Sequence, residues 1–376
     1  MIKFWSYKKE YIKHKKQLLK NIDKTISKGN IFFGDELKKF EKNFIKKYKS
    51  KFGIAVGSGT DALLISLLAL NIKKGDEIIT SANTAIPTIS AIINSGANPR
   101  LVDIGDDYLI DYKKIEKSIN KKTKAIIVVH LYGQSCNMEK IIKIANKYKL
   151  KIIEDCAQAQ GAKFKNKYVG TFGNFGCFSF YPTKILGAYG DGGFILTNNY
   201  NYYKRIKRIR FYGIETLDRK NKYFNKYYSN ENGLNSRLDE IQCSILNFKL
   251  KYVDKFIKRR IKIANIYKQK LSNTSLILPI LNKNSHHVFH LFTVYHSKKE
   301  IIENYLKRKK VETRVIYPYP IQTMKAYKKF KRNEKLNNSL IKSKGIFSLP
   351  LYPELTEKEV NNICKKIKDC LRIYKF

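Results

Sequence analysis

Residues 125–158 have the sequence AIIVVHLYGQSCNMEKIIKIANKYKLKIIEDCAQ. A β-branched apolar run (125–130) is followed by an amphipathic segment (138–150) and by a second apolar run (151–154). Short apolar runs indicate buried strands, and apolar residues at helical spacing indicate a helix that covers them. Two strands joined by a helix predict a parallel pair, so this stretch predicts an α/β fold.

The same alternation extends from Lys51 to about Thr197. It predicts further strands at 53–56, 77–80, 99–103, 176–179 and 193–197. It predicts further helices at 61–71, 85–95 and 112–119. After Asn235 the pattern predicts a long helix (237–269, with a change of direction near Val253), a strand (288–295), a helix (301–309) and a closing helix (356–371). We expect a mainly parallel central sheet in a large domain (1–245, with an N-terminal helical segment) and a smaller C-terminal α+β domain (246–376). The polar stretch 218–232 predicts a loop.

The composition predicts a cytoplasmic globular protein. The chain has 376 residues, of which 43% are hydrophobic, enough for a sizeable core. Residues 1–30 are rich in lysine and lack the apolar run of a signal peptide. The longest apolar run, Ala62–Leu70, is too short to span a bilayer, so no membrane partner is expected. Six cysteines without a C-x-x-C pair argue against a disulfide framework and against a zinc site.

Lys184 is the candidate catalytic residue. Residues 179–184, Ser-Phe-Tyr-Pro-Thr-Lys, place this lysine in a turn before the glycine-rich stretch 187–193. A desolvated lysine loses its proton readily and can form a Schiff base with an aldehyde. Small neighbours let a flat ring approach the backbone. By itself, however, a lysine in a turn is most often a solvated surface charge.

Asp155 follows the apolar strand 151–154, and a buried carboxylate requires a cation or hydrogen-bond donors. A protonated pyridine nitrogen is such a cation, and the pair keeps the ring able to accept electrons. Gln158, three residues further on, could reach a phenolic oxygen of the same ring. An aspartate in this place could equally cap a helix.

Residues 57–61, Gly-Ser-Gly-Thr-Asp, close one predicted strand and open a helix. Free N–H groups at a helix start, with hydroxyls beside them, bind phosphate. Ser179 offers a further hydroxyl. Loops use such residues anyway, so the motif is weak alone. Together, however, a lysine, a strand-end aspartate and a phosphate cradle are what pyridoxal 5'-phosphate (PLP) requires.

These motifs resemble the DegT/DnrJ/EryC/StrS family of sugar aminotransferases. The resemblance covers nearly the whole chain and is carried by residues 57–61, 129–133, 154–158, 178–184, 190–193 and 235–242. It implies PLP fold type I, the aspartate-aminotransferase fold, and a homodimer with shared active sites. Relatives with histidine in place of Lys184 are dehydratases, so the lysine favours transamination.

The resemblance also implies residue roles. Lys184 would hold PLP covalently and move a proton as general base and then acid. Asp155 would face the pyridine nitrogen, and Gln158 would face O3′ of the ring. The phosphate contacts would be Ser58, Gly59, Thr60 and Ser179, with Asn235 reaching the phosphate bound by the partner. The amino donor in this family is usually L-glutamate.

Segments 84–88, 287–292 and 315–320 are most similar to members that aminate C-3 of a dTDP-linked 3-keto-6-deoxyhexose in surface-polysaccharide precursor biosynthesis. Many C-4 enzymes have an aromatic residue at the position of Ala85, so we favour C-3 and keep C-4 as the alternative. Ile316 and Gln322 stand where those relatives usually have histidine. His130 and His290, the latter in the predicted strand 288–295, are expected to be structural. The candidate substrate contacts are Asn174, Tyr181, His286, His287 and Tyr317.

The charge leaves two further alternatives open. Seventy-five Lys and Arg against 31 Asp and Glu give +44, which could indicate a nucleic-acid or anionic-surface binder. The excess is nearly all lysine and is spread over every segment, so a solvated basic surface without a nucleic-acid partner is the preferred interpretation. A PLP protein with a non-transaminase role, such as dehydration or regulation, is the second alternative.

Overall fold

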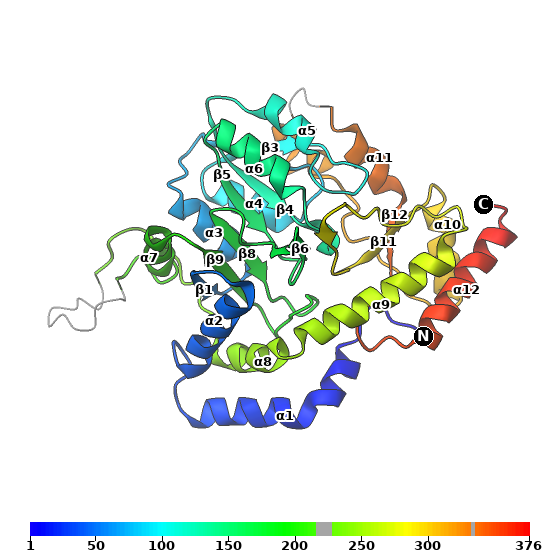
Figure 1. Ribbon diagram of the computed structural model, residues 1–376, viewed down its shortest axis with the longest axis horizontal. Coiled ribbons are helices and arrows are strands. Elements are labelled where there is room, and N and C mark those ends of the chain that lie inside the picture. The colour runs from blue at the N-terminus through cyan, green and yellow to red at the C-terminus, as the bar shows by residue number, and fades with distance from the viewer. Residues whose placement is uncertain (216–227, 332–334) are drawn as a thin grey trace.

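The computed structural model describes residues 1–215, 228–331 and 335–376. A seven-stranded sheet forms its centre (Figure 1). Its strand order is β1 (Phe52–Val56), β9 (Gly193–Thr197), β8 (Phe175–Ser179), β5 (Lys151–Asp155), β4 (Thr123–Val129), β2 (Glu77–Ser81) and β3 (Asn98–Val102). β9 runs antiparallel to both neighbours and the other four pairings are parallel. The prediction of a mainly parallel α/β sheet is confirmed.

Helices cover both faces of this sheet. The strands have apolar residues on both faces, and successive residues of a strand pack in cores on opposite sides of the sheet. Ile54 and Val56 of β1 pack in the core that contains α3 and α7, whereas Ala55 between them packs in the core that contains α2 and α8. The helices around the sheet are α2 (Asp35–Tyr48), α3 (Gly59–Ala69), α4 (Ile86–Asn94), α5 (Tyr112–Ile115), α6 (Met138–Lys147), α7 (Tyr200–Ile209) and α8 (Glu240–Leu250).

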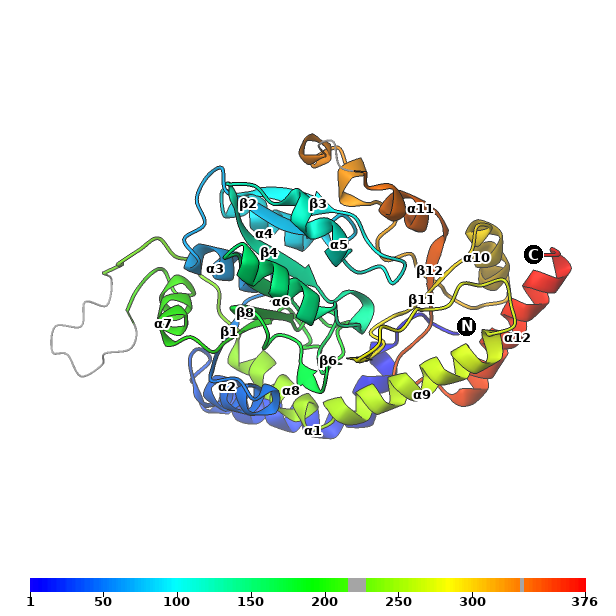
Figure 2. The same ribbon diagram turned by 45° about the horizontal axis from the view of Figure 1, so that its top comes forward.

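A second core lies toward the C-terminal part of the chain, at the right of Figures 1 and 2. It is built by a two-stranded antiparallel sheet and by helices, namely β11 (Phe292–Tyr295), β12 (Ile346–Leu349), α9 (Val253–Leu271), α10 (Lys299–Arg308) and α12 (Glu357–Ile373). The long helix predicted over 237–269 is split into α8 and α9 between residues 250 and 253, close to the predicted change of direction. The exact division at 245/246 stays a prediction.

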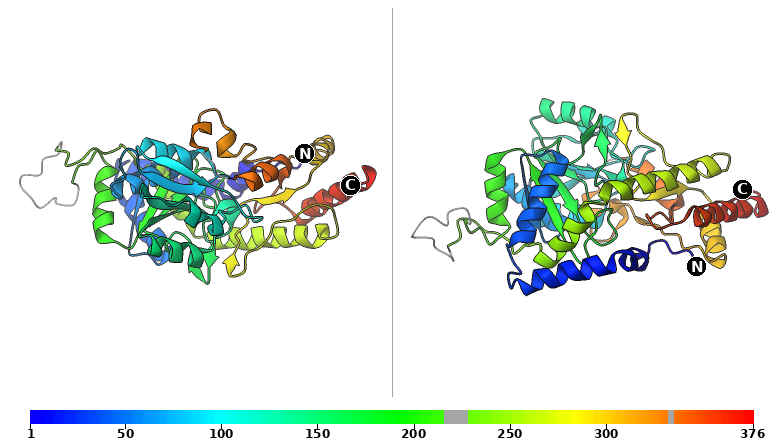
Figure 3. Two further views of the ribbon diagram at one scale, coloured as in Figure 1. Left: turned by 90° about the horizontal axis from the view of Figure 1, so that it is seen from above. Right: turned by 60° about the horizontal axis from the view of Figure 1, so that its bottom comes forward.

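The N-terminal helix α1 (Tyr7–Ser27) connects the two parts. Its buried Leu18 packs against Ile245 and Phe248 of α8. Ile2 and Trp5, just before it, pack against the second core. Figure 3 shows α1 running along the outside of the molecule toward the second core. The N-terminal segment therefore packs against both parts of the molecule.

The strand predicted over 288–295 is wrong in its first half. Only Phe292–Tyr295 forms a strand, so His290 is not within one. Phe289 has φ of 48°, a left-handed conformation that cannot continue a strand. Instead, the Val288 N–H donates to the Gly133 carbonyl at 2.9 Å, which ties this loop to the end of β4.

Several elements were not predicted from the sequence. Among them are α7, β12, β6 (Lys163–Phe164), β7 (Lys167–Tyr168), β10 (Ser285–His286), α11 (Asn337–Gly345) and the 3₁₀ turns at Leu131–Gly133, Ile321–Thr323 and Lys328–Phe330. Most of the predicted loop 218–232 lies at residues 218–227, outside the described residues. Over the described ranges, no helix has both the length and the apolar character needed to cross a bilayer.

Candidate active site

A cavity of about 570 Å³ lies at the carboxyl ends of β1, β4, β5 and β8. Parallel α/β sheets bind ligands at this edge. The cavity is lined by seven of the eight predicted cofactor residues, namely Ser58, Gly59, Thr60, Asp155, Gln158, Ser179 and Lys184. A larger, open hollow of about 840 Å³ lies between β3 and α11, and none of the predicted site residues lines it. The structure thus brings together side chains that are up to 126 positions apart in the sequence.

Lys184 extends into the cavity from the turn after β8. The turn is closed by the Lys184 N–H, which donates to the Tyr181 carbonyl at 2.8 Å. Burial lowers the pKa of the Lys184 amine from 10.5 to about 8, and the charge of Asp155 opposes part of that shift. At pH 7 about a tenth of this amine is therefore unprotonated, far more than for a lysine of ordinary pKa, and the unprotonated form is the nucleophile.

Asp155 ends β5 and is 6% exposed. Its carboxylate accepts hydrogen bonds from the Thr88 hydroxyl (2.9 Å) and from the Ala157 N–H (3.1 Å). Burial raises the pKa of Asp155, while both hydrogen bonds and the charge of Lys184 act against that rise. Among the described residues no ion pair is formed by this carboxylate, and Lys184 and His130 act on it only through space. The carboxylate is thus prepared for a cation supplied by a ligand.

The start of α3 lines one end of the cavity. Ser58 caps the helix, since its Oγ accepts the Asp61 N–H at 3.0 Å. A Cβ added to Gly59 would lie 2.7 Å from the Cβ of Ser179, so only glycine allows the helix start and β8 to approach this closely. The first N–H groups of a helix have no partner within it and carry partial positive charge, so this end suits a phosphate.

Gln158 is held by two hydrogen bonds. Its Oε1 accepts the Tyr132 N–H at 2.8 Å, and its Nε2 donates to the Tyr317 hydroxyl oxygen at 2.7 Å. Tyr132 has φ of 58°, a strained backbone conformation for a residue with a side chain, and such strain is often found at functional sites. The carboxamide of Gln158 is therefore fixed in orientation at the wall of the cavity.

The predicted substrate residues are only partly brought together. Tyr181 and Tyr317 line the cavity, Tyr181 as an exposed ring at its mouth. Asn174 lies before β8, at the opposite end of the sheet, where its Oδ1 accepts the Ile152 N–H at 2.9 Å. His286 pairs with Lys163 in the small sheet of β6, β7 and β10, and His287 is buried against Phe289. Neither of these histidines lines the cavity.

Asn235 is exposed and lies outside the cavity of its own chain. Its neighbour Ser236 accepts the Gly57 N–H at 2.9 Å and donates to Asp61 at 2.7 Å. The segment that carries Asn235 is thus anchored to the phosphate end of the cavity. The predicted contact with a partner's phosphate stays a prediction.

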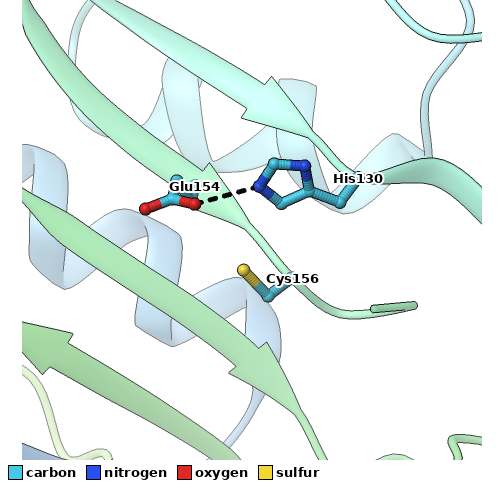
Figure 4. Close-up of side chains that lie close together, drawn as sticks. All are labelled: His130, Glu154 and Cys156. Atoms are coloured by element: carbon cyan, nitrogen blue, oxygen red, sulfur yellow. Dashed lines mark hydrogen bonds and ion pairs between the residues drawn. The ribbon is translucent and has the colours of Figure 1, made fainter. Parts of the chain in front are cut away.

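His130, expected to be structural, lines the cavity, and Figure 4 shows its ring facing Glu154 beside Cys156. Nδ1 of His130 accepts the Cys136 N–H at 3.1 Å, so its proton is on Nε2, which faces Glu154 at 3.1 Å. Glu154 also accepts three backbone N–H groups, those of Gly170, Phe172 and Gly173. His130, Glu154 and Cys156 lie close enough to hold a metal ion, but both ring nitrogens of His130 and both carboxylate oxygens of Glu154 already take part in hydrogen bonds. The group is a hydrogen-bonded network that joins the end of β4 to the end of β5.

Sequence patterns did not single out His130 and Thr88 as site residues. His130 ends the predicted strand 125–130 and directly follows β4, whereas Thr88 lies in α4, seven residues after the end of β2. A systematic search for polar side chains at the carboxyl ends of parallel strands would have found His130 but not Thr88. The remaining walls of the cavity are largely apolar and include Ile86, Ile316 and Met324.

Comparison with known proteins identifies the family. A model of the DegT/DnrJ/EryC1/StrS aminotransferase family matches residues 13–368. This chain belongs to that family. It is 39% identical to a dTDP-3-amino-3,6-dideoxy-alpha-D-galactopyranose transaminase of Aneurinibacillus thermoaerophilus over 98% of this chain and 99% of the relative. It is 34% identical to a dTDP-3-amino-3,4,6-trideoxy-alpha-D-glucose transaminase of Micromonospora megalomicea subsp. nigra over 98% of both chains.

The fold agrees with this DegT/DnrJ/EryC1/StrS membership. The crystal structure of S. venezuelae DesV in complex with a ketimine intermediate matches with a TM-score of 0.92 at 30% identity, over 98% of both chains. The protein is therefore a PLP-dependent sugar aminotransferase. Its own residues fit PLP. A buried carboxylate without a basic partner, a helix start closed by Gly59 against Ser179, and an amine with a lowered pKa line one cavity.

Proposed function

We propose that this aminotransferase transfers the amino group of L-glutamate to C-3 of a dTDP-linked 3-keto-6-deoxyhexose in a pathway to surface polysaccharides. The observation that carries the proposal is the shared cavity of Lys184, Asp155 and the start of α3. The two relatives named above both act on dTDP-linked 3-amino deoxy sugars, which supports the substrate class. We propose that the enzyme works in the cytoplasm.

The proposed roles follow from the contacts. When bound, PLP supplies a ring that accepts electrons from the carbon that loses its proton. Asp155, oriented by Thr88 and by the Ala157 N–H, holds the proton of the ring nitrogen. Ser58, Gly59, Thr60 and Ser179 hold the phosphate.

Lys184 carries the reacting amine. With a pKa of about 8, it can take a proton from the amino donor near neutral pH and then return one. Gln158, fixed by Tyr132 and Tyr317, presents its amide to the ring oxygen. The apolar walls of the cavity reduce water near these groups, which strengthens the interaction between the charges.

We also propose a homodimer whose partner completes each active site. Large apolar side chains are exposed at the mouth of the cavity, where Ile86, Tyr181 and Tyr319 are 48%, 52% and 65% exposed. Exposed apolar groups beside a binding site indicate that another surface covers them. Asn235 is exposed and its neighbour Ser236 is hydrogen-bonded to Gly57 and Asp61, which supports the proposed contact of Asn235 with the partner's phosphate. Sedimentation at several protein concentrations tests the dimer.

The position of amination is tested by supplying dTDP-linked 3-keto and 4-keto 6-deoxy sugars with L-glutamate and locating the new amine by NMR. The small side chain of Ala85 in the cavity wall supports C-3, and amination at C-4 is the alternative. We expect turnover of the 3-keto sugar. Turnover of only the 4-keto sugar would refute the C-3 assignment, and Lys184→Ala should abolish turnover of either.

A further inference from the structure

Lys249 of α8 is a buried lysine that the reaction described above does not use. It is 3% exposed. Its Nζ lies 2.8 Å from Oε1 of Glu10 on α1 and 2.9 Å from the carbonyl oxygen of Gly187, and it lies over the ring of Tyr189 at 4.2 Å from the centroid. A buried ammonium group is costly unless an opposite charge and hydrogen-bond acceptors compensate for the loss of water. Here a carboxylate, a carbonyl and an aromatic face match them.

Gly187 belongs to the turn that carries Lys184. The turn folds back on itself, and a Cβ at Gly187 would collide with the carbonyl of Pro182. The position of the Gly187 carbonyl is therefore coupled to the backbone just before Lys184. Lys184, Gly187, Glu10 and Lys249 also line one small hollow of about 20 Å³, room for about one water molecule.

Two other side chains hold the same turn, namely the buried Gln160 and the half-buried Gln242. Gln160 donates to the Ser179 carbonyl at 2.6 Å and exchanges hydrogen bonds with the backbone of Leu186 at 3.2 Å. Gln242 of α8 accepts the Tyr189 N–H at 3.0 Å. Lys249 differs from both because it is charged and because its counter-ion comes from α1, which lies outside the sheet.

We propose that Lys249 is a positioning residue for Lys184. Its ammonium group, balanced by Glu10, holds the Gly187 carbonyl and so fixes the turn from which the Lys184 side chain enters the cavity. The helix α1 thereby takes part in setting the geometry of the cofactor site. The inference rests on the proposed role of Lys184.

The test separates positioning from stability. Lys249→Met removes the donor but leaves the carboxylate of Glu10, whose side chain is only 14% exposed, without its ion-pair partner. The double variant Lys249→Met/Glu10→Gln removes that stranded charge, so we expect it to regain most of the melting temperature lost by the single variant. Because the Gly187 carbonyl still lacks its donor, we expect the rate of PLP uptake by the apoprotein, followed by visible absorbance, to stay roughly tenfold below wild type.

Lys47→Met is the matched control. Lys47 is also largely buried (14% of its side chain is exposed) and pairs with Asp254 at 2.8 Å, but it lies on α2 away from the turn. Its variant should take up PLP at the wild-type rate. Lys249→Gln/Glu10→Gln, a neutral side chain one atom shorter than lysine, replaces the methionine variant if the latter does not fold, and should also be slower than wild type.

A double variant that regains its melting temperature and takes up PLP as fast as wild type would overturn the proposal. The wild-type protein is tested first for covalent PLP on Lys184. A negative result there refutes the role of Lys184 itself, whereas normal wild-type binding together with an unimpaired double variant refutes only the role of Lys249.

Discussion

Glu154→Gln tests the network under the cofactor site. Oε2 of Glu154 faces His130 Nε2 (3.1 Å) and accepts the Gly170 N–H (2.7 Å), while Oε1 accepts the N–H groups of Phe172 (2.7 Å) and Gly173 (2.8 Å). The carboxylate is fully buried. Glutamine has the same shape, but an NH₂ group, which only donates, replaces one of the two acceptor oxygens. Each oxygen accepts two hydrogen bonds, so in either orientation of the amide two donors of the protein lose their acceptor.

The magnitude follows from those two orphaned donors. Each buried donor left without a partner costs about 1–3 kcal/mol, so the variant should lose about 2–6 kcal/mol, less what is recovered by removing a buried charge. With an unfolding entropy of about 2.1 cal/mol/K per residue, a chain of 376 residues should melt about 3–8 °C lower.

The assay is thermal unfolding of the apoprotein by circular dichroism. The matched control is Glu139→Gln, a carboxylate that is largely exposed and paired with Lys165 at 2.6 Å, which should melt within about 1 °C of wild type. If Glu154→Gln also melts within about 1 °C of wild type, then the four hydrogen bonds of Glu154 do not contribute to stability by the amount given above.

Three further predictions concern the cavity. Because the pKa of Lys184 is lowered to about 8, the rate of PLP uptake should rise about tenfold per pH unit below pH 8 and level off above it; a rate still rising in proportion at pH 9.5 would indicate an ordinary lysine of pKa 10.5. Thr88→Val removes a 2.9 Å hydrogen bond to Asp155 and should weaken PLP binding about tenfold, measured by equilibrium dialysis; unchanged binding would show that Asp155 does not need this donor. Gly59→Ala places a Cβ 2.7 Å from that of Ser179 and should weaken binding of PLP by about tenfold or more; wild-type affinity would show that the helix start does not hold the phosphate.

The large-scale fold could be predicted because its elements have strong local patterns. All seven strands of the central sheet were predicted with the right type, since each is a short apolar run followed by turn residues. The strand predicted from residue 288 does not form at Phe289, which has a left-handed backbone, and the neighbouring Val288 N–H bonds to Gly133, more than 150 positions away. The two-residue strands β6, β7 and β10 carry no periodic signal at all.

Residues that line the cavity could be predicted from the sequence where a local motif marks them. Lys184, Asp155 and Gly59 follow local motifs, and all three line the cavity. The residues that hydrogen-bond to these side chains or to their turns are brought there by the tertiary fold, so the local sequence does not predict them. The bonds from Thr88 to Asp155 and from Lys249 to Gly187 join residues 67 and 62 positions apart, and no local pattern marks them.

Asn174 is a predicted substrate contact that does not line the cavity. The resemblance points to it by its position, ten residues before Lys184. Strand β8 lies between the two, so they end at opposite edges of the sheet, and the Asn174 amide serves the backbone of Ile152. A strand of five residues spans about 17 Å, which a motif does not show.

The central claim is that Lys184 holds the cofactor in an aminotransferase site. The most direct measurement is to reduce the PLP-loaded enzyme with borohydride, digest it and locate the modified peptide by mass spectrometry. The account predicts that the cofactor mass is found on Lys184 and that prior addition of L-glutamate removes most of it. Cofactor on another lysine, or on none, would contradict the account.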